Sequence, residues 1–93
     1  DPEGYYYLAL IYVNQNKNWR AISYYTQAIS RLSADLGYII SEGTHDVTLN
    51  LSDLYLKRAE VYKTEEETDL MCEDYKKACE LGECEAYNEY CLE

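Results

Sequence analysis

The chain has 93 residues, of which 47% are hydrophobic, and its eight basic and eighteen acidic side chains give a net charge of −10. This length and apolar content fit one small globular domain and exclude general disorder. The acidic surface repels phosphate backbones and anionic lipids, and the longest apolar run, residues 5–13, is too short for a bilayer. We therefore expect no nucleic-acid partner and no membrane insertion.

Apolar side chains recur at helical spacing in the first half of the chain. Residues 1–3, Asp-Pro-Glu, have the types that begin a helix, and a stripe at i, i+3, i+4 and i+7 runs from Tyr5 to Tyr12. An Asn-rich run at residues 14–18 ends this helix, because Asn tolerates left-handed backbone. A second stripe, in steps of three and four from Ile22 to Ile39, predicts a helix from about residue 18 to 40.

Three further helices are predicted in the second half. One is secure from Leu54 to Thr64, and its start stays open between a backward extension to Asp46 and a cap at Ser52. The next should run over residues 69–81, with Thr68 as its N-cap, or Thr64 in an alternative, and Gly82 in the position of a C-terminal glycine. Residues 84–91 are long enough for a short fifth helix.

An internal repeat organises these helices. Tyr5, Leu8, Ala9 and Tyr12 are followed by Ala21, Tyr25 and Ala28, and fifty residues later the same positions hold Tyr55, Arg58, Ala59 and Tyr62, then Met71, Tyr75 and Ala78. Small residues let the two helices of a hairpin approach closely and leave room for the Tyr rings. Both copies resemble the tetratricopeptide repeat pattern of aromatic, Leu, small and aromatic residues, then small, aromatic and small ones.

This resemblance implies an all-α fold of two antiparallel helix hairpins of the α-solenoid type plus a short C-terminal capping helix. We expect one domain over residues 1–93. It would contain repeat one at about 2–35, an insert at about 36–51, repeat two at about 52–85 and the cap at 84–93. The copies depart from the pattern in having no closing Pro, Arg58 at the Leu position and Met71 at a small position.

The offset between the copies is fifty residues instead of the family's thirty-four, which inserts sixteen residues between helices two and three. Split evenly, the insert would lengthen each of these two antiparallel helices by about two turns. We predict that helix two continues beyond Ala34 and that the loop Gly43–Asp46 forms its tip.

The family's first helices usually line a concave groove, so the resemblance implies binding positions on two helices. They are Glu3, Tyr6, Leu10 and Val13 in repeat one, and Asp53, Leu56, Glu60 and Lys63 in repeat two. Some members bind acidic tails through a clamp of Lys, Arg and Asn, but Tyr6, Leu10 and Glu60 stand at matching places. We therefore expect a basic or apolar peptide or partner, not an acidic one.

Four cysteines lie in the last twenty-two residues. Cys72 and Cys79 are seven residues apart, and so are Cys84 and Cys91. Around the Gly82 turn, Cys79 would meet Cys84 and Cys72 would approach Cys91. The Sel1-like class of related repeats is similar around residues 77–82, which supports the inner pair. Free buried thiols and, less favoured, a zinc site remain alternatives. Disulfides would place the protein outside a reducing cytosol, most plausibly in a bacterial envelope, and free thiols in the cytoplasm.

The sequence predicts an interaction module or scaffold, not an enzyme. His45 is the only histidine, and although Asp46 follows it, we interpret the two as part of an exposed polar loop and expect no cofactor and no metal. The acidic runs at residues 65–67 and 83–85 are interpreted as solvated turns. One alternative is an assembly role, as a fragment of a longer array or a homodimer, through the Tyr6, Leu10 and Val13 surface. The other is a thiol redox or metal-binding protein.

Overall fold

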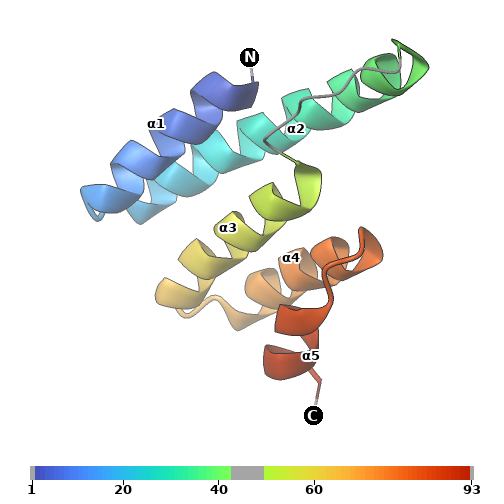
Figure 1. Cartoon of the computed structure of the whole chain (residues 1–93). Helices are drawn as coiled ribbons and strands as arrows, with labels where there is room; N and C mark the ends of the chain where they lie inside the picture. The colour runs from blue at the N-terminus through green and yellow to red at the C-terminus, as the bar shows by residue number, and fades with distance from the viewer. Residues whose placement is uncertain (1, 43–49, 93) are drawn as a thin grey trace.

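The computed structural model describes residues 2–42 and 50–92, with side chains up to residue 33 in the first segment. Within these residues the chain is all-α, as predicted, and the helices follow one another in order (Figure 1). They are α1 (Pro2–Asn14), α2 (Asn18–Glu42), α3 (Leu51–Thr64), α4 (Thr68–Glu80) and α5 (Glu85–Tyr90).

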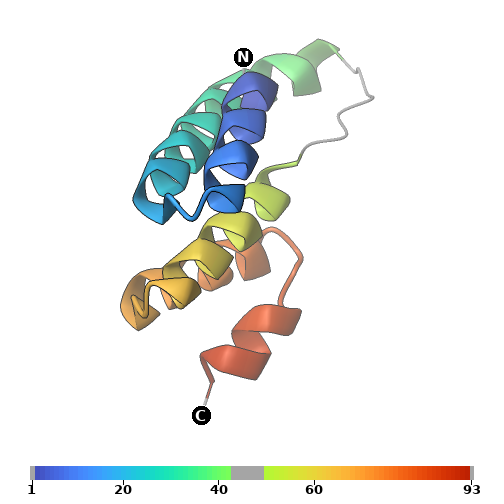
Figure 2. The ribbon, with the colours of Figure 1, turned by 90° about the vertical axis from the view of Figure 1, so that its left-hand side faces the viewer.

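The helices form two hairpins and a cap. Helix α1 packs on α2, α3 packs on α4, α2 and α3 form the seam between the hairpins, and α5 lies against α4. In Figures 1 and 2, α1 and α5 therefore lie at opposite ends of the stack. One hydrophobic core joins the two hairpins. Five alanines at the helix crossings are fully buried, and they are Ala9, Ala21, Ala28, Ala59 and Ala78.

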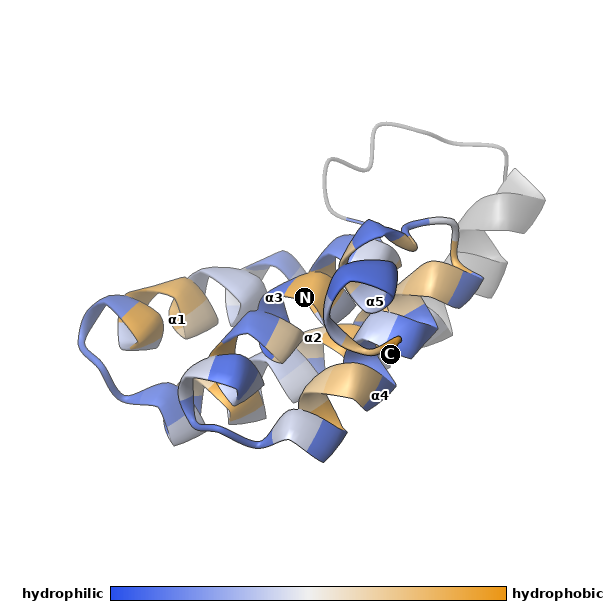
Figure 3. Ribbon diagram, turned by 90° about the horizontal axis from the view of Figure 1, so that it is seen from below, coloured by the Kyte–Doolittle hydropathy of each residue, from blue (hydrophilic) through white to orange (hydrophobic). Residues whose placement is uncertain are grey.

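Three helices end in the same type of turn, with a positive φ angle and two backbone hydrogen bonds. Asn16, Glu66 and Gly82 have positive φ angles of 62°, 61° and 110°. In each turn the N–H of this residue donates to the carbonyl three residues back, and the next N–H donates to the carbonyl five back. These paired bonds satisfy the last carbonyls of the helix. The expected roles of the Asn-rich run and of Gly82 are thus confirmed, whereas Glu66 carries out the same role without the usual residue type. The two hairpin turns are hydrophilic (Figure 3).

The prediction that helix two continues beyond Ala34 is confirmed, because α2 ends at Glu42 after 25 residues. The even division of the insert is wrong. Helix α3 has 14 residues against 13 in α1, so within the described residues the added helical length belongs to α2. The expected tip, Gly43–Asp46, and His45 within it lie outside the described residues.

Both expected starts of α3 are also wrong. The side chain of Asn50 accepts hydrogen bonds from the backbone N–H of Asp53 at 2.9 Å and from the hydroxyl of Ser52 at 2.7 Å. Asn50 is therefore the N-cap, and Ser52 supports it from within the helix.

Helix α4 begins one residue earlier than predicted and lacks the predicted cap. Thr68 is its first residue, and Glu67 occupies the N-cap position without a side-chain cap hydrogen bond. The alternative cap also fails, because the hydroxyl of Thr64 donates back to the carbonyl of Glu60 at 3.2 Å. Helix α5 is shorter than its predicted span by one residue at each end.

Candidate protein-interaction surface

Arg58, which departs from the repeat pattern, connects three helices. Its guanidinium donates from Nε and Nη2 to the two carboxylate oxygens of Asp74 on α4, at 2.8 and 2.7 Å, and from Nη1 to the hydroxyl of Thr26 on α2, at 2.9 Å. The guanidinium also lies 5.7 Å from the ring centroids of Tyr55 and Tyr62. Burial opposes the charged form, but the hydrogen bond and charge of Asp74 outweigh it and raise the pKa of Arg58.

Repeat one fills the equivalent space with apolar and aromatic groups. Fifty residues before Arg58 and Asp74 stand Leu8 and Tyr24. The Tyr24 ring stacks on Tyr12, at a centroid distance of 5.5 Å, and on Tyr5, at 6.2 Å. The ion pair therefore belongs to repeat two, which contacts the preceding hairpin, and the aromatic stack belongs to repeat one.

The expected solvated turn at residues 65–67 is wrong for Glu65. Its carboxylate accepts hydrogen bonds from the side-chain amide of Asn18 at 2.8 Å and from the indole N–H of Trp19 at 3.2 Å. The Trp19 ring also lies edge-on to Tyr62. These contacts connect the turn of the second hairpin to the start of α2, so Glu65 takes part in the seam between the hairpins.

Three of the predicted groove residues meet in a hollow of about 210 Å³ between α1 and α3. Leu10 and Val13 line it from α1 and Glu60 from α3, with Tyr25 of α2 alongside. Tyr25 is almost fully buried, and burial, followed by the nearby Tyr6 and Glu60, raises its pKa to about 12. The α1–α3 hollow is therefore small and mixed, because its apolar residues are accompanied by the carboxylate of Glu60 and the ammonium of Lys57.

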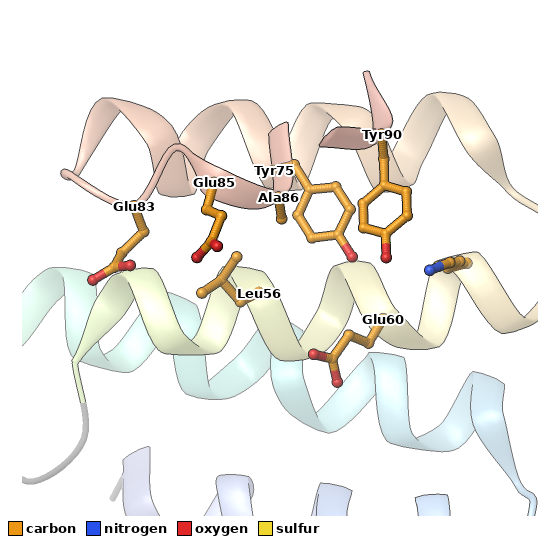
Figure 4. A pocket seen from close by; sticks show the side chains of 8 residues that line it. Leu56, Glu60, Tyr75, Glu83, Glu85, Ala86 and Tyr90 are labelled. Carbon is orange, nitrogen blue, oxygen red and sulfur yellow. The ribbon is translucent and has the colours of Figure 1, made fainter. Parts of the chain in front are cut away.

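A larger groove of about 340 Å³ lies between α3 and the C-terminal cap, and we call it the acidic groove. Figure 4 shows that Leu56 and Glu60 reach it from α3, and that its opposite wall comes from α4, α5 and the turn between them. The residues of that opposite wall are Tyr75, Glu83, Glu85, Ala86 and Tyr90. Glu60 lines both the acidic groove and the α1–α3 hollow.

A cation from the chain itself lies on the aromatic wall of this groove. The ammonium of Lys63 is 3.8 Å from the ring centroid of Tyr90, and the Tyr90 ring stacks on Tyr75 at 5.8 Å. A hydrogen bond and charge interactions with Tyr90 raise the pKa of Lys63. Burial is the main cause that raises the pKa of Tyr75. The groove thus combines three carboxylates with two stacked rings that hold an ammonium group.

The remaining predicted positions line neither hollow. Tyr6 is half-buried and packs on Tyr25, with ring centroids 6.2 Å apart. Asp53 is half-buried in the first turn of α3, where its backbone N–H contributes to the cap. Glu3 is exposed on α1. Leu56, Glu60 and Lys63 are thus groove residues that the sequence predicts, whereas the repeat pattern assigns none of the opposite wall to binding.

Two disulfides build that opposite wall. Cys72 pairs with Cys91 and Cys79 with Cys84, in the nested order that the spacing predicts, and no cysteine is left free. They hold the turn and α5 against α4. Helix α5 has no fully buried residue, so the covalent links supply positioning that packing alone does not. The pairing replaces the alternatives of free thiols and a cysteine-bound zinc.

No helix within residues 2–42 and 50–92 is long and apolar enough to cross a membrane. The same residues contain no group of three or more His, Cys, Asp or Glu side chains arranged to hold a metal ion.

The repeat geometry agrees with a family comparison. The family model described as "Tetratricopeptide repeat" matches residues 2–31 and 52–81, the two hairpins of the structure. This chain belongs to the tetratricopeptide repeat family. Such repeats are generally non-enzymatic modules for protein–protein interaction, and the match does not extend to the Sel1-like class. No curated protein and no solved structure matched the chain.

Proposed function

We propose that this tetratricopeptide repeat protein binds a basic segment of a partner protein in the acidic groove. The observation that carries the proposal is the position of Lys63, whose ammonium lies on the Tyr90 ring beside three glutamates. An ammonium at this point has both an aromatic face and excess negative charge around it. A Lys or Arg side chain from a partner would find the same two features.

The charge balance of the groove supports a cationic ligand. Glu60, Glu83 and Glu85 provide three carboxylates against the single ammonium of Lys63. Lys63 is an exposed residue, so its ammonium can leave the ring at little cost when a partner's cation takes its place. The apolar wall of Leu56 and Ala86 would accept the aliphatic stem of that side chain. The α1–α3 hollow, which shares Glu60, would take the next apolar side chain of the same peptide.

Fluorescence anisotropy with a labelled peptide of Lys, Arg, Leu and Ala tests the proposal, with a peptide carrying Glu in place of the basic residues as reference. The basic peptide should bind, and its affinity should fall as salt screens the carboxylates. The double variant Glu60→Gln/Glu85→Gln should weaken binding about three- to tenfold, since each charge pair at a surface contributes up to about 1 kcal/mol. Lys63→Met should strengthen it, because the competing internal cation is removed.

The matched control is Glu73→Gln/Glu80→Gln. These two exposed glutamates of α4 line a different hollow, and their replacement changes the net charge by the same amount. If the control weakens the basic peptide as much as the groove variant does, attraction is only to the overall charge and the groove is not the site. Equal affinity for the acidic peptide would also refute the proposal.

We also infer the finer features of the chain's organisation. Residues 1–93 would act as one domain whose disulfide-linked cap resembles Sel1-like repeats. The two disulfides favour a compartment outside the reducing cytosol, and a bacterial envelope stays a prediction.

A further inference from the structure

The opposite wall of the acidic groove is built mainly by one short segment that two disulfides hold. Tyr75 stands on α4, whereas the other four side chains of this wall come from residues 83–90. Cys84 ties the start of the segment to α4, and Cys91, directly after its end, ties it to α4 again. The shape of the groove therefore depends on bonds between sulfur atoms.

The inner disulfide, Cys79–Cys84, has support from the backbone. It spans the turn in which the N–H of Gly82 donates to the carbonyl of Cys79 at 2.9 Å. In the same turn the N–H of Glu83 donates to the carbonyl of Ala78, also at 2.9 Å. These two bonds complete the end of α4 without any sulfur atom. The turn, and Glu83 within it, should therefore keep its place when the inner disulfide is absent.

The outer disulfide, Cys72–Cys91, has less support. Within residues 50–92 no backbone hydrogen bond joins α5 to another helix. Helix α5 has six residues, none of them fully buried, and a helix of this length is not stable by its own hydrogen bonds. Ala86 and Tyr87 are half-buried against the core, and Tyr90 remains 44% exposed. The outer disulfide is therefore the main link that holds the α5 part of the wall in place.

The outer disulfide also borders a second hollow, of about 380 Å³, that a reductant can enter. Cys72 and Cys91, both half-buried, line this hollow together with Tyr87. The remaining lining side chains are charged, and they are Asp69, Glu73 and Lys76. None of these residues lines the acidic groove. A thiol in the second hollow can therefore reach the disulfide without entering the groove.

We propose that the Cys72–Cys91 disulfide is a redox switch for the acidic groove. The inference rests on the proposed function, and its co-reactant is a dithiol. One thiolate of the dithiol attacks a sulfur of the disulfide, and the S–S bond breaks to give a mixed disulfide and a cysteine thiolate. The second thiolate then attacks the mixed disulfide and releases the other cysteine. The dithiol loses two electrons and two protons and becomes a disulfide, and the two cysteines take them up and become thiols.

Reduction of this bond releases α5 from α4 and opens the groove. The Tyr90 ring then leaves its stack on Tyr75 and its contact with the ammonium of Lys63. Glu85 leaves the groove with the same helix, as Figure 4 lets the reader follow. The aromatic face and one carboxylate are therefore lost together. The two hairpins keep their common core, so peptide binding changes without unfolding of the domain.

Two variants that each keep one disulfide test the proposal, with the labelled basic peptide as ligand and dithiothreitol as reductant. Cys79→Ser/Cys84→Ser keeps the outer bond and, when oxidised, should bind as the wild type does. Its reduction should weaken binding about tenfold, because a carboxylate and the aromatic face leave together. The matched control, Cys72→Ser/Cys91→Ser, keeps only the inner bond and should bind weakly both before and after reduction. Circular dichroism establishes that both variants retain their hairpins.

Two results would overturn the proposal. One is wild-type affinity of Cys72→Ser/Cys91→Ser, and the other is an affinity of Cys79→Ser/Cys84→Ser that reduction leaves unchanged. Amide hydrogen exchange separates this failure from failure of the proposed function. Exchange over residues 85–90 should increase when the outer bond is reduced, while exchange in α3 stays slow. If the oxidised wild type binds no basic peptide, the proposed function fails, and unchanged exchange in α5 on reduction would refute the switch by itself.

Discussion

Replacing Arg58 by Leu, the residue at the same position of repeat one, should destabilise the protein strongly. Arg58 and Asp74 form a two-pronged ion pair whose side chains are only 16% and 4% exposed. Leucine would leave the Asp74 carboxylate buried beside an apolar group, with both of its hydrogen bonds from the guanidinium lost. Removing one partner of a buried pair costs about 3–5 kcal/mol, mostly from the uncompensated charge that remains.

This loss is large on the scale of the whole domain, because a chain of this size is stabilised by only about 5–10 kcal/mol. The double variant Arg58→Leu/Asp74→Tyr would reproduce the Leu8 and Tyr24 pair of repeat one. It removes both charges and supplies a ring between Tyr55 and Tyr62, so we expect it to lie within about 2 kcal/mol of the wild type. Arg58→Lys should fall in between, since an ammonium keeps the charge but cannot donate both bonds in this geometry.

Urea unfolding followed by far-ultraviolet circular dichroism gives the free energies for this double-mutant cycle. The expected coupling between the two positions is at least about 2 kcal/mol. A loss below about 1 kcal/mol for Arg58→Leu alone, or a double variant whose loss equals the sum of the single losses, would refute the reasoning. Either result would mean that the carboxylate finds water or another donor once the guanidinium is gone.

Three further expectations concern a turn, a tyrosine and a disulfide. Glu66→Gly should stabilise the protein by about 1 kcal/mol in urea unfolding, since φ is 61° there, whereas Glu66→Gln should not if backbone conformation and not charge is the cause. Burial raises the pKa of Tyr25 to about 12, against 10 in the unfolded chain, so its contribution to stability is complete below pH 10 and is lost as the pH rises towards 12. This contribution amounts to roughly 3 kcal/mol. The free energy of unfolding of Tyr25→Phe should not show this loss at high pH. Cys72→Ser/Cys91→Ser should lower stability by about 3 kcal/mol and increase amide hydrogen exchange in α5, and unchanged exchange would contradict the positioning role of the disulfide.

The fold was predictable because its main determinants are local or periodic. The small residues Ala9 and Ala59 and their fifty-residue offset identify two equivalent hairpins, and the unbroken stripe to Ile39 predicts the long α2. Gly82 predicts a positive φ angle at its own position. Each of these signals depends on residue type and spacing within one helix or one turn.

The start of α3 shows where such signals fail. Asn50 and Ser52 are both good capping residues, and only the geometry of the chain that enters the helix decides which side chain reaches a free N–H. The division of the insert fails for a similar reason, because the offset gives the number of added residues but not which helix receives them. Glu66 shows that a turn repeated from one hairpin to the next can impose a left-handed conformation on a residue type that does not favour it.

Only one wall of the acidic groove was predictable from the sequence. Its α3 wall follows from the repeat position of Leu56, Glu60 and Lys63, because equivalent positions share a helix face. The opposite wall depends on long-range structure. Glu83 and Glu85 reach the groove only because the disulfides return the chain after Gly82 across α4, and sequence spacing alone does not orient their side chains.

Arg58 also explains why equivalent positions of the two repeats hold different residue types. At the seam, a guanidinium can satisfy a carboxylate on its own hairpin and a hydroxyl on the preceding one, so the polar group fixes how the hairpins meet. In repeat one, Leu8 with the Tyr24 stack needs no partner for hydrogen bonding. Leu8 at this position is 39% exposed in the described chain, whereas Arg58 is largely covered. The double variant Arg58→Leu/Asp74→Tyr therefore tests whether the seam accepts the apolar arrangement of repeat one.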